Sequence, residues 1–178
     1  MQLLLTALDR QVSTTMVIWL FPLAFLVHDL EEILTMERFI RMNRERFPKL
    51  LQRVAPITTT QFTIGVTILF VLTMWASFLA TRSPRDMNWL TICLAIFLLH
   101  VVTHVAQTLL LHSYTPGVIT AVLVVLPYSL YAFHHLFSDR LISEDDVNAS
   151  LLIGALLAIP ILLGVRQLGK GVARFIKH

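Results

Sequence analysis

Residues 17–32 read Val-Ile-Trp-Leu-Phe-Pro-Leu-Ala-Phe-Leu-Val-His-Asp-Leu-Glu-Glu, an apolar run that ends in a histidine and three carboxylates. With its flanks, this run is long enough to cross a bilayer as a helix, which takes about 20 residues. One charged side chain at the centre of such a helix costs at least about 2.5 to 3.5 kcal/mol, so charged residues there usually face a protein interior, a water-filled cavity or an ion. On a helix, His28, Glu31 and Glu32 share one face. Asp29 is expected to point about 100° away from that face.

The composition of the whole chain indicates an integral membrane protein. Of its 178 residues, 56% are hydrophobic and only 14% are charged, whereas soluble domains carry about 25% charged residues. Five apolar runs are long enough to span a bilayer, and they lie at 12–35, 57–80, 88–112, 116–137 and 148–168. We therefore expect a single all-α domain over residues 1–178, an integral membrane bundle of about five transmembrane helices.

The basic residues predict the orientation of this bundle. Of the 14 lysines and arginines, ten lie in the segment 36–56 or in the tail after residue 165, on one side of a five-span bundle. The other side holds four, which are Arg10, Arg82, Arg85 and Arg140. Because cytoplasmic loops carry the excess of positive charge, we predict the N-terminus outside, the C-terminus cytoplasmic, and 36–56 as a basic cytoplasmic stem that continues the first helix. We expect the plasma (inner) membrane, with the first span retained as an anchor because no signal-peptide pattern surrounds it.

A second polar stripe lies on the predicted helix 88–112. It consists of His100, Thr103, His104 and Gln107. These positions fall within an arc of about 100° on a helix. With a rise of about 1.5 Å per residue, His104 lies about 12 Å and His28 about 10 Å above the cytoplasmic ends of two helices that run in the same direction. The two stripes are therefore expected to meet at one depth.

Imidazoles and carboxylates on facing helices are how helical bundles build metal centres. The predicted ligands are His28, Glu31, Glu32, His100 and His104. This donor set suits a divalent transition metal such as zinc, iron or manganese. Hydrogen bonds that orient the ligands are expected from Gln107, Thr103 and Thr35. Two other interpretations remain open, a structural imidazole–carboxylate network and metal-free acid–base chemistry.

The remaining histidines and the cysteine are predicted to lie away from this site. His134 and His135 fall near the outer membrane surface, about 25 Å or more above the cytoplasmic end. His112 and Tyr114 lie at the cytoplasmic mouth and are interpreted as interfacial anchors, with the lining of an entrance as the alternative. Cys93 is the only cysteine, so no intrachain disulfide can form.

Three motifs give the chain a resemblance to the HXXEE-domain family of small integral membrane proteins, namely His28-x-x-Glu31-Glu32, His100-x-x-x-His104 and Tyr114-x-Pro116-Gly117. The first motif gives that family its name, and its place inside a membrane helix makes the match specific. The resemblance extends from the first helix to at least the start of the fourth. It implies an integral membrane protein and marks His28, Glu31 and Glu32 as characteristic residues, but it implies no activity.

A looser similarity in chemistry links the chain to the glutamic intramembrane proteases of the CAAX class. It rests on Glu31 and Glu32 together with Phe97, His100 and His104. In that class a glutamate pair activates water, and histidines on later helices stabilise an oxyanion. The class pattern has an arginine four residues after the second glutamate, where this chain has Met36, and the chain is also short for that class.

Together these features predict a metal-dependent membrane enzyme that acts on a lipid-like or hydrophobic substrate. In a hydrolytic version the metal activates a bound water, and Glu31 or Glu32 is the general base beside a catalytic His104. In an oxidative version, two metals use the same kinds of ligand. The alternatives are a metal-free Glu/His hydrolase, a small transporter that handles protons or metal ions, and a scaffold subunit. Membrane lipid is an expected partner, whereas nucleic acid is not, because no basic patch with interleaved aromatic residues occurs.

Overall fold

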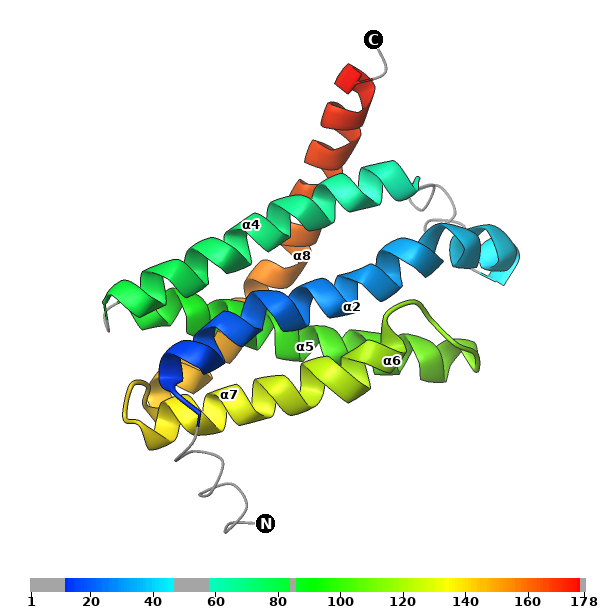
Figure 1. The fold of residues 1–178 in the computed structure, drawn as a ribbon. Helices are drawn as coiled ribbons and strands as arrows, with labels where there is room; N and C mark the ends of the chain where they lie inside the picture. Colours follow the sequence, from blue (N-terminus) through cyan, green and yellow to red (C-terminus); the bar gives the residue numbers. More distant parts are fainter. Residues whose placement is uncertain (1–11, 47–57, 84–85, 177–178) are drawn as a thin grey trace.

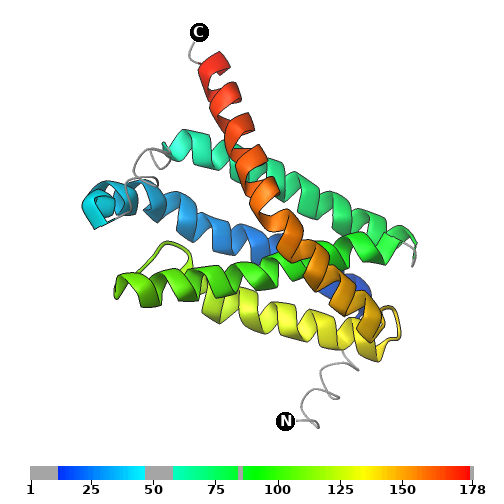
Figure 2. The same ribbon diagram turned by 180° about the vertical axis from the view of Figure 1, so that it is seen from behind.

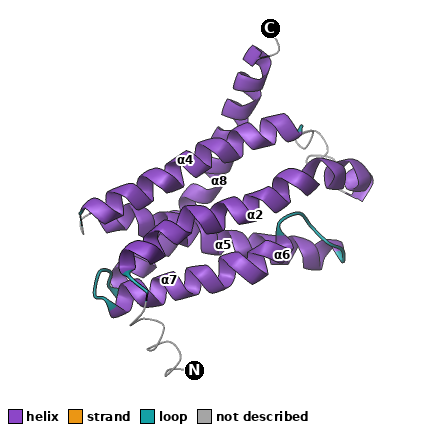
Figure 3. Cartoon of the chain, viewed as in Figure 1, coloured by secondary structure: helices purple, strands orange, loops and turns teal. Residues whose placement is uncertain are grey.

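The computed structural model describes residues 12–46, 58–83 and 86–176, and over these ranges the chain is helix and loop with no strand (Figure 3). The elements in chain order are α2 (Thr14–Asn43), η1 (Arg44–Arg46), α4 (Thr59–Arg82), α5 (Met87–Leu111), α6 (Val118–Thr120), η3 (Ala121–Val125), α7 (Leu126–Ser138) and α8 (Glu144–Ile176). Of the two η elements, η1 is a 3-10 turn and η3 is a π-helical segment that joins α6 to α7. The predicted all-α class is confirmed.

Four helices are long and apolar enough to cross a membrane, and they are Thr59–Arg82, Met87–Leu111, Val118–Ser138 and Glu144–Gly169. They match four of the five predicted spans, so the chain is a helical membrane protein. The helix at the remaining span, α2, is not one of these four, and it carries three carboxylates midway along its length. It also continues to Asn43, into the predicted stem, whereas 47–56 lies outside the described residues. The orientation of the termini and the identity of the membrane stay predictions.

Side-chain caps fix where several helices begin. The side-chain oxygens of Ser13 and Thr58 each accept a hydrogen bond of 3.3 Å from the N–H three residues later, at the starts of α2 and α4. At the start of α8, the N–H and the hydroxyl of Ser143 both donate to the Asp146 carboxylate. The N–H of Asp146 donates back to the Ser143 hydroxyl at 3.2 Å, which completes a reciprocal cap.

The helix α2 lies between α4 on one side and the α6–α7 segment on the other, and α5 lies behind it (Figure 1). The helix α8 packs across α4 and α5 and lies in front of them in Figure 2, where its C-terminal part projects beyond the other helices. Contacts at both ends show that α2 and α4 are antiparallel. Glu37 accepts a hydrogen bond from the N–H of Thr59 at 2.6 Å, and the hydroxyl of Ser77 donates to the carbonyl of Ile18 at 3.1 Å.

An aromatic core joins α2 to α5 and shows that these two helices run in the same direction, as predicted. The ring of Phe97 lies 5.6 Å from that of Phe21 and 5.8 Å from that of Phe25. Further along both helices, Glu32 meets His104. All three phenylalanines are buried, so a rigid apolar layer adjoins the polar stretch of α2.

Candidate metal centre

Four of the five predicted ligands come together between α2 and α5. They are His28, Glu32, His100 and His104. Each residue offers one ligand atom, and these atoms all lie within 4.8 Å of one another. Because each helix contributes a pair at i, i+4 spacing, the two stripes face each other across one helix–helix contact. The sequence-based expectation of a meeting at one depth is therefore met for these four residues.

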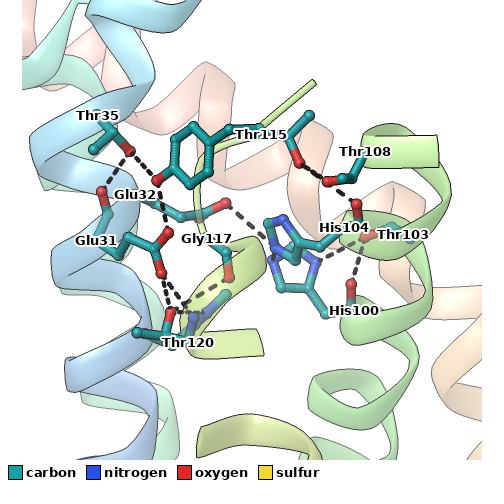
Figure 4. Close-up of polar contacts among 12 residues, drawn as sticks. Glu31, Glu32, Thr35, His100, Thr103, His104, Thr108, Thr115, Gly117 and Thr120 are labelled. Carbon is teal, nitrogen blue, oxygen red and sulfur yellow. Dashed lines mark hydrogen bonds and ion pairs between the residues drawn. The ribbon is translucent and has the colours of Figure 1, made fainter. Parts of the chain in front are cut away.

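The polar atoms of this four-residue group converge on its centre. Nε2 of His104 lies 2.8 Å from Nε2 of His100 and 3.4 Å from Oε1 of Glu32 (Figure 4). The ring of His28 lies 5.0 Å from the ring of His104 and 5.4 Å from that of His100, edge-on to both. Three imidazoles and one carboxylate thus surround a common point.

Threonine hydroxyls hold two of the rings by the nitrogen that faces away from the centre. Nδ1 of His28 lies 3.0 Å from the hydroxyl of Thr120, and Nδ1 of His100 lies 3.3 Å from that of Thr103. Nε2 of His28 is buried and has no hydrogen-bond partner among the described residues. A hydrogen bond on one ring nitrogen fixes the tautomer and leaves the other nitrogen as a ligand, which is the usual arrangement for metal-binding histidine.

Three of the four residues in the group are buried. The exposed fractions are 0% for His28, 5% for Glu32 and 2% for His104, while His100 is half-buried. A buried carboxylate needs a proton, a cation or several hydrogen bonds to offset its desolvation. A divalent cation at the centre of the group would supply that compensation.

Glu31 lies outside the four-residue group, although it was predicted as a ligand and as a possible base. Its Oε2 accepts hydrogen bonds from the N–H and the hydroxyl of Thr120, at 2.8 and 2.6 Å. Its Oε1 accepts a hydrogen bond from the hydroxyl of Tyr114 at 2.6 Å. The adjacent glutamates of α2 therefore have different partners. Glu32 faces the histidines, whereas Glu31 faces the segment that follows α5.

The turn between α5 and α6 covers the four-residue group. Gly117 has a φ of 83°, and a Cβ there would lie 2.8 Å from Cε1 of His104, 2.9 Å from Cγ of Glu32 and 3.0 Å from Cε1 of His28. No side chain fits in that space. Thr115 in the same turn is fully buried and shares a hydrogen bond of 2.6 Å with Thr108. The glycine backbone thus forms one wall of the site.

Tyr114 contributes more than the interfacial anchor that the sequence predicted. Its hydroxyl donates to Glu31 and also lies 3.5 Å from the Thr35 hydroxyl. Partial burial, followed by the hydrogen bond to Glu31, raises the pKa of the Tyr114 phenol above its usual range. The phenol is therefore a neutral hydrogen-bond donor at physiological pH.

The three residues that were predicted to orient the ligands, Thr103, Thr35 and Gln107, make different contacts. Thr103 bonds the ring of His100 and also donates to its backbone carbonyl at 2.7 Å. Thr35 donates to the backbone carbonyl of Glu31 at 2.6 Å, so its hydroxyl lies near the site but serves Glu31, outside the four-residue group. Gln107 is exposed on α5.

Sequence reasoning missed Thr120 and Gly117. Both reach the site from a segment far away in the chain, although glycine after proline does signal a turn. Asp29 was expected to point away from the shared face, and it is not among the four converging residues. It is nevertheless only 5% exposed, and its Oδ2 has no hydrogen-bond partner in the part of the chain described. Its position four residues after the buried Phe25 was the available signal for burial.

Two further observations bound the site. The buried ring of Phe97 lies 5.8 Å from the ring of His28, so the aromatic core adjoins the group at His28. At the far end of α2, the Thr14 hydroxyl donates to Asp139 and lies 3.4 Å from Nε2 of His135. This second polar contact belongs to the opposite end of the bundle, where the sequence placed His135.

Comparison with known proteins gives one match. The family described as a protein of unknown function with HXXEE motif matches residues 19–132, which include the four-residue group and the turn that covers it. Neither the curated proteins nor the solved structures contain a significant match, and the similarity to CAAX-class proteases gains no support. Because the matched region is more than half of the chain, this protein belongs to the HXXEE family.

Proposed function

We propose that the chain is a membrane-embedded, metal-dependent enzyme in which His28, Glu32, His100 and His104 hold a divalent transition metal. The observation that carries the proposal is the convergence of three imidazoles and a carboxylate at a buried point. The outward-facing hydrogen bonds of His28 and His100 add to it, because they fix those rings in the orientation that a metal needs. Zinc, iron and manganese all accept this donor set.

A metal in this position would lower the pKa of a bound water or polarise a carbonyl of the substrate. The three histidines and Glu32 would hold it, and iron or manganese would accept all four donors. If zinc were held by the histidines alone, Glu32 would instead be placed to take up a proton from the water.

The surroundings of the site favour a lipid-like or hydrophobic substrate. The group lies between helices of a membrane bundle, and the outer faces of α5 and α7 carry exposed apolar side chains such as Leu110 and Leu130. A transporter for protons or metal ions is disfavoured, because the buried layer of Phe21, Phe25 and Phe97 adjoins the site and offers no polar path onward.

A metal-free Glu/His hydrolase is the second candidate. The distance of 2.8 Å between Nε2 of His100 and Nε2 of His104 favours it, because one ring can donate to the other without a metal. In that version Glu32 and the histidine pair share protons, and Glu32 acts as general base.

The metal content of the purified full-length protein separates the two candidates. We expect about one equivalent of zinc, iron or manganese per chain in the wild type and a large loss in His104→Ala. The exposed His134 provides a matched control, and His134→Ala should keep the metal. A wild-type protein that holds none of these metals, and binds none on addition, would overturn the metal-dependent proposal and leave the metal-free candidate.

A further inference from the structure

Glu31 and Glu32 are adjacent, but their carboxylates do different things. Glu32 presents Oε1 to His104, within the four-residue group. Both oxygens of Glu31 are engaged by other donors, Oε1 by Tyr114 and Oε2 by the N–H and hydroxyl of Thr120. Three strong donors on one carboxylate make a tight local contact, because hydrogen bonds to an ionised group are about twice as strong as neutral ones.

The partners of Glu31 flank the glycine that covers the site. Tyr114 precedes Gly117 by three residues, and Thr120 follows it by three. Between these two attachments, the backbone of Gly117 lies against His28, Glu32 and His104. The side chain of Glu31, on α2, therefore binds the segment 114–120 on both sides of Gly117. We call this segment, which lies over the four-residue group, the cover.

Glu37, further along α2, accepts the same pair of hydrogen bonds from a threonine but lies away from the four-residue group. Its Oε2 accepts the N–H of Thr59 at 2.6 Å and also the Thr59 hydroxyl, at the start of α4. Glu31 makes this pair of bonds with Thr120 at the start of the α6–η3–α7 segment. The two glutamates thus use one type of helix-start contact, and only that of Glu31 adjoins the four-residue group.

We propose that Glu31 is a positioning residue that holds the segment 114–120 closed over the four-residue group, and that release of this contact opens the site to its ligand and substrate. The proposal deepens the function proposed above and rests on it for the identity of the ligand. It divides the roles of the paired glutamates of α2, because Glu32 belongs to the four-residue group and Glu31 holds the covering segment. It also makes the end of the bundle near Tyr114, which is 41% exposed, the route of access.

Cobalt(II) is a suitable probe, because its visible absorption reports the ligands around it. The full-length protein would be loaded with Co²⁺ as wild type, Glu31→Gln, Glu32→Gln and Glu37→Gln. We expect Glu31→Gln to keep the wild-type spectrum but to release Co²⁺ to excess chelator about tenfold faster. Glu32→Gln should change or lose the spectrum, and Glu37→Gln should behave as wild type. Tyr114→Phe removes one of the three donors and should show an intermediate release rate.

Two outcomes of the cobalt experiment would overturn the proposal. If Glu31→Gln loses the spectrum as Glu32→Gln does, then Glu31 is a ligand rather than a positioning residue. If Glu31→Gln releases Co²⁺ at the rate of Glu37→Gln, then Glu31 does not hold the cover.

A metal-independent measurement separates failure of this proposal from failure of the proposed function. Thr115 is a fully buried residue of the covering segment itself, so Thr115→Cys in a Cys93→Ala background reports opening by its reaction with a water-soluble thiol reagent. We expect faster labelling when Glu31→Gln or Tyr114→Phe is added, and no change with Glu37→Gln. Equal labelling rates in all backgrounds would show that Glu31 does not hold the segment 114–120 closed over the site. Faster labelling in a protein that binds no Co²⁺ would support the cover and overturn the metal-dependent function.

Discussion

The hydroxyl of Thr120 lies 3.0 Å from Nδ1 of His28, although 92 positions separate the two residues in the chain. The same threonine gives both its N–H and its hydroxyl to Glu31. One residue at the end of α6 therefore orients a candidate ligand and anchors the cover above it. This double role makes Thr120 the most informative position for mutation outside the four-residue group.

Replacement of Thr120 by valine should weaken metal binding while the helices stay intact. Valine keeps the shape but loses the hydroxyl that holds the His28 ring, and loss of such an outer contact lowers metal affinity about 10- to 100-fold. Competition with a coloured chelator would measure the affinity. Thr120→Ser, which keeps the hydroxyl, should restore most of it. Thr67→Val is a control on an exposed threonine of α4, and an equal loss there would contradict the assigned role.

Replacement of Gly117 by alanine should destabilise the protein. Its φ of 83° is unfavourable for alanine, and the new Cβ would lie within 3.0 Å of three side chains of the site. We expect a loss of about 1 to 3 kcal/mol in the free energy of unfolding in detergent. Gly164→Ala is the control, because a Cβ there meets no atom within 4 Å and lies in a helix, where alanine is favoured. Equal stabilities of the two variants would show that the turn does not lie where the structure has it.

Phe97→Ala should lower the free energy of unfolding by about 3 to 5 kcal/mol, because it leaves a cavity in a fully packed core. Phe97 is 4% exposed and contacts Phe21, Phe25 and His28. Leu110→Ala on the same helix, where the side chain is 80% exposed, should change stability by less than about 0.5 kcal/mol. Denaturant titration of both variants in the same detergent would measure the difference. If Leu110→Ala lowered the free energy of unfolding as much as Phe97→Ala does, Phe97 would not belong to the packed core.

The contact between Glu37 and Thr59 should make the α2–α4 junction sensitive to acid. Glu37 lies beyond the predicted span 12–35, and hydrogen bonds from the side chain and backbone of Thr59 hold the pKa of its carboxyl below the usual 4.5. A lowered folded-state pKa adds stability above the unfolded pKa, and this stability is lost as the pH falls through the folded value. The melting-temperature advantage of wild type over Thr59→Val should therefore shrink between about pH 7 and about pH 4. An advantage that does not change over this range would contradict the lowered pKa.

Helical spacing and depth predicted much of the site from the sequence. His28 and Glu32 on α2, and His100 and His104 on α5, share faces because i, i+4 spacing is a local property of any helix. Their meeting required only that the two helices run in the same direction and reach the same depth. Both conditions follow from counting spans and residues, so a chain of this kind reveals such a pair of stripes without a structure.

The remaining features depend on contacts that no local pattern encodes. The distinction between Glu31 and Glu32 is set by how α2 is rotated relative to α5 and α6, and one residue of helix is a rotation of about 100°. The burial of Asp29 depends on the same rotation. Thr120 follows an ordinary turn, and its part in the site comes only from the packing of the α6–η3–α7 segment against α2.

The helix α8 supplies none of the side chains of the four-residue group or of the cover among the residues described, and it packs instead on α4 and α5. The region matched by the family ends at residue 132, before α8 begins, and still holds every residue of the site. The candidate site is therefore contained entirely within the region that the family match covers. We therefore expect that changes in the part of α8 that projects beyond the other helices will leave the positions of these four side chains unaltered.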